Sequence, residues 1–209
     1  MNRTHAIVSS LAAGVAFAGS ATADVMWDEA IDGDLSTDYM NPTQLFSKAT
    51  GSNHVIFTTV GAADNGGEQD REYFTFTIDE GFQLSALYLS LFETDPASNL
   101  GFIGVASGTS MPTSPDAPNP TTLLGYALVG TGDVGNDILQ SMGTGAGSQG
   151  FSGPLGPGSY TFWVQETGPS TDNWDLDFVI EATTPVVPGP GVLAGLVGIA
   201  CLTGRRRRG

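Results

Sequence analysis

Apolar and polar residues alternate with a period of two in several stretches of the middle of the chain, and this alternation predicts β-strands. The clearest stretch is residues 73–78, in which Phe74, Phe76 and Ile78 fall on the face expected to meet the core. Residues 83–93 are apolar on both faces, which predicts a central strand covered on both sides. The other predicted strands are residues 53–60, 100–106, 123–129, 158–166 and 174–181.

Helical periodicity is nearly absent from the same region. Only residues 134–142 favour a short helix, with Asp133 as its cap. Residues 167–173 are long enough for a hairpin loop between the last two strands, and residues 111–120, with four prolines, predict an irregular exposed loop. Seven to nine strands without alternating helices predict an all-β fold, an antiparallel β-sandwich of jelly-roll type, over residues 24–184.

The N-terminal end has the pattern of an export signal. Arg3 precedes a mainly apolar run, residues 6–18, and Ala21-Thr22-Ala23 then supplies the small-x-small site that signal peptidase reads. We therefore expect residues 1–23 to be a signal peptide, cleaved after Ala23 to leave Asp24 as the first residue of an exported protein.

The C-terminal end, residues 185–209, has the pattern of a membrane segment. Pro188, Gly189 and Pro190 precede a mainly apolar run, and the chain ends with Arg205, Arg206, Arg207, Arg208 and Gly209. Residues 186–204 carry no charge and approach the length of about 20 residues that a membrane-spanning helix needs. Terminal arginines favour a cytoplasmic C-terminus. Cys201 within this segment is either a lipidation site or an apolar filler.

The Pro-x-Pro sequence, the hydrophobic segment and the final arginines resemble the sorting signal of PEP-CTERM proteins, the substrates of exosortases. The resemblance implies that an exosortase-type enzyme removes the tail from an inner-membrane intermediate, after which the protein reaches the cell surface or the extracellular space. Gly189 stands where the family usually has glutamate, which leaves the identity of the sorting enzyme open. A permanent membrane anchor is the alternative.

Charge is distributed very unevenly along the chain. Residues 24–184 contain all 22 acidic residues but only two basic residues, Lys48 and Arg71. Because binding to nucleic acid requires clustered basic residues, nucleic acid is excluded as an expected partner. The only cysteine is Cys201, so this region has no internal disulfide and its stability must come from a hydrophobic core.

Two further sequence stretches resemble the bacterial pre-peptidase C-terminal domain. Residues 70–78 place acidic residues before a Tyr-Phe-x-Phe strand, and residues 150–162 contain a Gly/Pro-rich turn that leads into Tyr160. The resemblance implies a jelly-roll-like sandwich of the kind usually attached to secreted peptidases.

Acidic residues also suggest a calcium site. The loop containing Asp64, Asn65, Glu68 and Asp70 is rich in oxygen donors and glycine, the composition that Ca²⁺ prefers. A second group of acids crowds the first strand and turn: Asp28, Glu29, Asp32, Asp34 and Asp38. Zinc is not expected, since His54 is the only histidine after the predicted signal peptide.

Trp163 and Trp174 lie on the last two predicted strands, where they either stack on a sugar ring or pack in the core. No Gly-x-Ser-x-Gly motif is present and His54 lies within a predicted strand, so no catalytic residues are assigned and we expect no enzyme. The sequence therefore favours a non-catalytic cell-surface or matrix protein. The alternative is a calcium-assisted polysaccharide-binding module, and a carboxylate-based hydrolase is a weaker third hypothesis.

Overall fold

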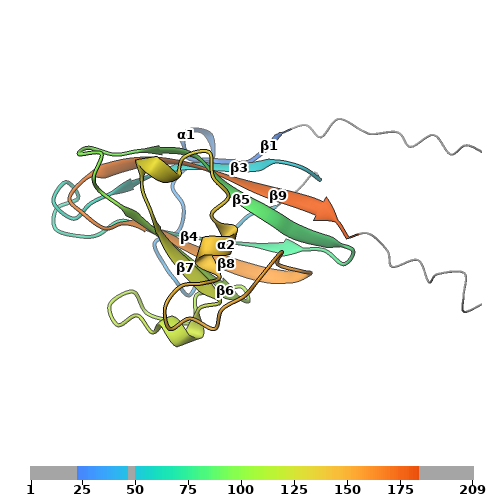
Figure 1. Cartoon of the computed structure of the whole chain (residues 1–209). Helices are drawn as coiled ribbons and strands as arrows, with labels where there is room; N and C mark the ends of the chain where they lie inside the picture. Colours follow the sequence, from blue (N-terminus) through green and yellow to red (C-terminus); the bar gives the residue numbers. More distant parts are fainter. Residues whose placement is uncertain (1–22, 47–49, 184–209) are drawn as a thin grey trace, which may run out of the picture.

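The chain between its two ends folds into two mixed β-sheets with little helix (Figure 1). The computed structural model describes residues 23–46 and 50–183. The elements are β1 (Asp24–Asp28), α1 (Glu29–Asp32), β2 (Thr43–Gln44), β3 (Asn53–Val60), β4 (Arg71–Ile78), β5 (Phe82–Glu93), β6 (Gly101–Ser107), η1 (Pro120–Thr122), β7 (Gly125–Val129), η2 (Thr131–Asp133), α2 (Leu139–Met142), β8 (Gly158–Glu166) and β9 (Thr171–Ala182). Within the described residues, no helix combines the length and apolar character needed to cross a bilayer.

The strands are ordered β1-β3-β9-β5 in the first sheet and β2-β4-β8-β6-β7 in the second. Neighbouring strands are antiparallel except for β1 with β3 and β2 with β4, which are parallel pairs. The prediction of a purely antiparallel fold is therefore wrong at one edge of each sheet. From β1 to β6 the chain alternates between the two sheets, so each parallel partner is reached by the long connection that parallel pairing requires.

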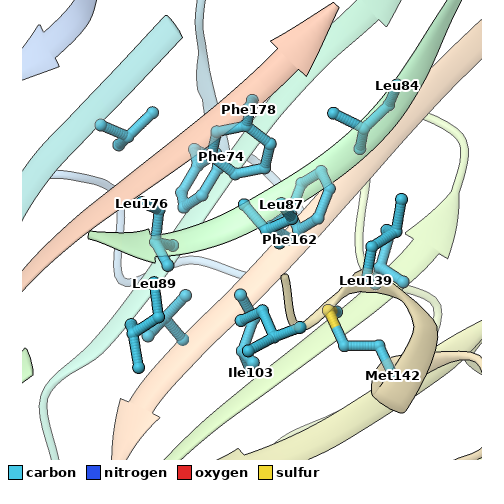
Figure 2. Packing of buried hydrophobic residues seen from close by; sticks show 14 of the residues in the cluster. Phe74, Leu84, Leu87, Leu89, Ile103, Leu139, Met142, Phe162, Leu176 and Phe178 are labelled. Atoms are coloured by element: carbon cyan, nitrogen blue, oxygen red, sulfur yellow. The ribbon is translucent and has the colours of Figure 1, made fainter. Parts of the chain in front are cut away.

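Side chains from both sheets form one hydrophobic core (Figure 2). Within it, the Phe162 ring on β8 lies 5.5 Å from the Phe74 ring on β4 and 5.0 Å from the Phe178 ring on β9. Phe76 and Ile78 belong to the same cluster, so the face predicted from the alternation of residues 73–78 is confirmed. The outer face of β4 is also covered, because Tyr73 is buried in a second, smaller cluster.

That second cluster modifies the prediction for residues 111–120 only at the start of the segment. The segment is irregular, as its prolines predict, but Met111 at its start is fully buried together with Tyr73 and Trp163. The Met111 backbone N–H donates to the Tyr39 carbonyl at 2.8 Å. Most residues after Met111 are exposed, as predicted, and Met111 attaches the start of the segment to the outer face of the second sheet.

Strand β5 differs from its prediction as a central strand covered on both sides. It lies at an edge of the first sheet, and its Tyr88 and Leu91 side chains are 38% and 36% exposed. Two register shifts, one between Leu84 and Ala86 and one between Leu89 and Leu91, change which residues face inward. β-Bulges have this effect, and they explain why apolar residues occur at both parities along this strand.

The predicted helix at residues 134–142 is reduced to the single turn of α2. The preceding residues pair with the β5 edge: Gly135 N–H donates to the Leu89 carbonyl and Ile138 N–H to the Leu87 carbonyl, both at 2.8 Å. Exposed strand edges need such partners, and this requirement outweighs the weak helical propensity of the segment. Asp133 does act as a capping residue, but for η2, where its side chain accepts the Gly130 N–H at 2.8 Å.

The predicted hairpin between the last two strands is also wrong. Strand β8 lies in the second sheet between β4 and β6, whereas β9 lies in the first sheet between β3 and β5. The connection therefore crosses from one sheet to the other. The length of the connection permits either a hairpin or a crossing between sheets. The crossing forms because β8 pairs with β4 and β6, whereas β9 pairs with β3 and β5.

Close packing at Gly125 yields a testable prediction. A Cβ atom there would lie 2.2 Å from the Met142 carbonyl oxygen, a backbone atom that cannot swing away. We expect Gly125→Ala to lower the free energy of unfolding by about 1–3 kcal/mol in urea titrations, the usual cost of overpacking. Gly132→Ala is the matched control, because a Cβ there has no neighbour within 4 Å. Equal stability of the two variants would contradict the packing at β7.

Candidate functional site

Three acidic side chains from distant parts of the chain meet at one place. Glu29, Asp34 and Glu72 each offer a carboxylate oxygen, and these oxygens lie within 4.8 Å of one another. It is the single such group of potential metal ligands among the described residues. We call Glu29, Asp34 and Glu72 the carboxylate cluster.

Local structure at the start of the fold positions the first two members. Glu29 is the first residue of α1, whose N-terminus is capped by the Asp28 side chain accepting the Ala30 N–H at 3.0 Å. Gly33 ends the helix with a φ of 89°, a conformation that glycine adopts without strain, and so turns the chain into Asp34. One oxygen of Glu29 accepts the Thr58 backbone N–H of β3 at 2.8 Å.

The third member, Glu72, comes from the second sheet. It lies on β4 two residues before Phe74 and therefore on the core-facing side of the strand. Its exposure is 0%, and neither of its carboxylate oxygens accepts a hydrogen bond from a donor in the described part of the chain. A buried ionised carboxylate without a partner carries a large desolvation cost, so this side chain requires compensation by a proton or a cation.

Asp70 lies next to the cluster. It is half-buried, and one of its oxygens accepts the Val60 N–H of β3 at 3.1 Å. Its negative charge is the largest electrostatic influence of any neighbour on Glu72. Among the four residues of the predicted calcium loop, Asp70 is the one that lies beside the carboxylate cluster.

Burial and mutual repulsion raise the pKa values of Glu72, Glu29 and Asp70. Burial raises the pKa of Glu72 from 4.5 to about 9, and the charges of Asp70, Asp34 and Glu29 add to this effect. Burial, followed by a hydrogen bond with Asp34, raises the pKa of Glu29 to about 7. Burial also raises the pKa of Asp70. Without a compensating cation, the cluster therefore retains protons at neutral pH.

The other residues of the predicted calcium loop are not part of this arrangement. Asp64, Asn65 and Glu68 are exposed in a turn held by backbone hydrogen bonds, such as Glu68 N–H to the Asn65 carbonyl at 3.1 Å. The carboxylates of Asp64, Glu68 and Asp70 do not form a group with oxygens within 4.8 Å of one another. Calcium binding by this loop remains a prediction.

The two tryptophans of the sugar hypothesis are buried and lie in different sheets. Trp163 on β8 is 3% exposed and Trp174 on β9 is fully buried. The Trp174 ring stacks on Phe57 at 5.9 Å, and its Nε1–H donates to the Thr59 hydroxyl at 3.0 Å. Of the two alternatives for these tryptophans, the structure shows packing in the core, because both rings complete hydrophobic clusters.

The predicted processing residues lie mostly outside the described part of the chain. Ala23 is the first described residue and is exposed. The remaining residues of both signals lie outside the described residues: Ala21, Pro188, Gly189, Pro190, Arg205, Arg206, Arg207 and Arg208. The membrane helix and both cleavage positions remain predictions.

A separate pair of buried acids lies where the chain crosses from β8 to β9. Glu166 and Asp172 are both fully buried, and Glu166 accepts hydrogen bonds from the Gly168 N–H and the Ser170 hydroxyl. Burial, followed by the charge of Asp172, raises the pKa of Glu166 to about 7. This pair is separate from the carboxylate cluster and has two carboxylates instead of three.

His54 lies within β3, as predicted, and its Nδ1 is 2.7 Å from an oxygen of Asp175 on the neighbouring strand β9.

Comparison with protein-family models, with curated proteins and with solved structures gives no match.

Proposed function

We propose that the protein is an exported, non-catalytic component of the cell surface or extracellular matrix, sorted through its C-terminal tail. One observation carries the proposal: β1 begins at Asp24 and β9 ends at Ala182. Cleavage after Ala23 and near Pro188 would therefore leave every described strand intact. A β-rich body bounded in this way is compatible with processing at both ends.

The composition of the body supports this role. An exported domain with 22 acids and two basic residues is strongly anionic, which favours solubility and disfavours self-association. The finer classification as a jelly-roll sandwich of the pre-peptidase C-terminal type is part of the same proposal. It is supported by the core shared between the two sheets and by the chain crossing repeatedly between them.

A calcium-assisted polysaccharide-binding module is the weaker proposal. It relied on Trp163 and Trp174 as stacking faces, and both are buried.

Intact mass and fractionation of the protein made in its native host test the proposed function. The expected species begins at Asp24, ends near Pro188 and is found outside the inner membrane. Pro188→Ala combined with Pro190→Ala should leave the tail attached and the protein in the membrane. The control combines Pro112→Ala with Pro118→Ala, two exposed prolines of the body, and should be processed normally.

Two results would contradict the proposal. A wild-type species that retains Arg205–Arg208 in the membrane would identify a permanent anchor instead of a sorting signal. A species that retains residues 1–23 in the cytoplasm would exclude export.

A further inference from the structure

The carboxylate cluster lacks a compensating positive charge from the described chain. Arg71 is the single Lys or Arg among the described residues. Although Arg71 precedes Glu72, the two side chains point to opposite faces of β4. The Arg71 Nη2 atom lies 3.5 Å from an oxygen of Asp116, on the outer side of the sheet. Among the described residues, no Lys or Arg side chain supplies positive charge to the cluster, which leaves protons or a bound cation for that role.

The arrangement of oxygens suits a cation. A Ca²⁺ ion binds oxygens at about 2.3–2.6 Å, so two oxygens that share one ion lie at most about 5 Å apart. The oxygens of Glu29, Asp34 and Glu72 lie within 4.8 Å of one another and meet this requirement without a change of fold. Glu72 adds an independent indication, because its fully buried carboxylate is directed into the cluster and no donor of the described residues satisfies its oxygens.

We propose that Glu29, Asp34 and Glu72 bind a divalent cation, with Ca²⁺ as the ion that fits best. Asp70 lies beside the ion and adds negative charge. Asp34 is exposed, so it provides the entry path, and water supplies the further oxygens that a coordination number of six to eight requires.

The donor set selects the class of ion. All ligands are oxygens, which favours hard cations, whereas zinc sites in proteins are built mainly from nitrogen and sulfur. Mg²⁺ requires near-ideal octahedral geometry and keeps most of its water, while Ca²⁺ accepts irregular sets of carboxylates. Three carboxylates from separate segments form such an irregular set.

Isothermal titration of the purified protein, first stripped with EDTA, tests the site. CaCl₂ is expected to bind with one ion per chain and a Kd of about 10⁻³ M or tighter, as in extracellular modules, and more tightly than MgCl₂. The thermal unfolding midpoint should rise with CaCl₂ concentration, because the folded state binds the ion.

Variants locate the site. Glu72→Gln keeps the shape of the side chain and is expected to weaken Ca²⁺ binding at least tenfold. Asp34→Asn should also weaken Ca²⁺ binding. Because Asp34 is exposed, this variant is expected to fold, and it tests the site even if Glu72→Gln fails to fold. The matched control combines Asp64→Asn with Glu68→Gln in the exposed loop and should keep the wild-type Kd.

Three results would overturn the proposal. These are an absence of both heat and thermal shift with CaCl₂, a wild-type Kd in both Glu72→Gln and Asp34→Asn, or tighter binding of Mg²⁺ than of Ca²⁺. Loss of binding in the loop control alone would move the site to Asp64 and Glu68. None of these results depends on whether the tail is processed.

Discussion

Replacing Trp174 with alanine is expected to lower the free energy of unfolding by about 3–5 kcal/mol, the range for large aromatic residues removed from a core. Trp174 is fully buried at the centre of an aromatic group: Phe57 stacks on it at 5.9 Å and Phe92 meets it edge-on at 4.6 Å. Its removal would leave a cavity that these rings cannot fill and would also leave the Thr59 hydroxyl without its donor.

Urea unfolding monitored by far-UV circular dichroism measures this effect. Tyr88→Ala is the control, since Tyr88 is also aromatic and lies on the strand next to β9, but its side chain is 38% exposed. We expect the control to lose much less stability than Trp174→Ala. If Trp174→Ala were as stable as the control, Trp174 would not be a core residue and the sugar-stacking hypothesis would regain its basis.

The strands were predictable because their local pattern agrees with their final environment. Residues 53–60 and 158–166 coincide with β3 and β8, and Phe74, Phe76 and Ile78 face the core as their spacing predicts. Period-two alternation reports which side chains must be buried, and burial is the main source of stability in a protein without disulfides.

Sheet membership could not be read from the same pattern. The loop between β8 and β9 fits a hairpin by length, yet the strands belong to different sheets, because each pairs with strands far away in sequence. The two register shifts in β5 had a similar effect, since a bulge exchanges the two faces of a strand without leaving a clear sequence signal.

The candidate site was partly visible in the sequence. Phe74 and Phe76 are two residues apart, and the same spacing places Glu72 on the core-facing side of the strand. A charged residue at a core-facing position was the signal for a buried site that the sequence analysis missed. Glu29 and Asp34 belong to the acidic group noted near the first strand. Their meeting with Glu72 depends on how the two sheets face each other, which no local pattern encodes.

In EDTA, the protein is expected to lose stability as the pH rises from about 5 to about 8. Glu166 has a pKa of about 7 in the folded protein and an ordinary value of 4.5, so the folded state binds more protons than the unfolded state between these values. Its contribution is therefore fully present below pH 4.5 and is lost as the pH rises through about 7.

The size of the effect follows from the pKa shift. One pKa unit corresponds to about 1.4 kcal/mol, so the shift of Glu166 corresponds to roughly 3 kcal/mol between pH 5 and pH 8. Glu72 and Glu29 act in the same direction, with pKa values of about 9 and about 7. Most proteins are instead stabilised as their carboxyl groups ionise, so the opposite slope is diagnostic of these buried acids.

Glu166→Gln separates this contribution from the others. The amide resembles the protonated acid and cannot ionise, so urea unfolding of the variant between pH 5 and pH 8 should show a slope reduced by roughly 3 kcal/mol over this interval. Asp172 stays as the neighbouring carboxyl, which limits the change to one group. Glu80→Gln, at an exposed turn, should keep the wild-type slope. If Glu166→Gln kept the full wild-type slope, the result would refute the raised pKa of Glu166, because burial and the charge of Asp172 would then not hold its proton to neutral pH.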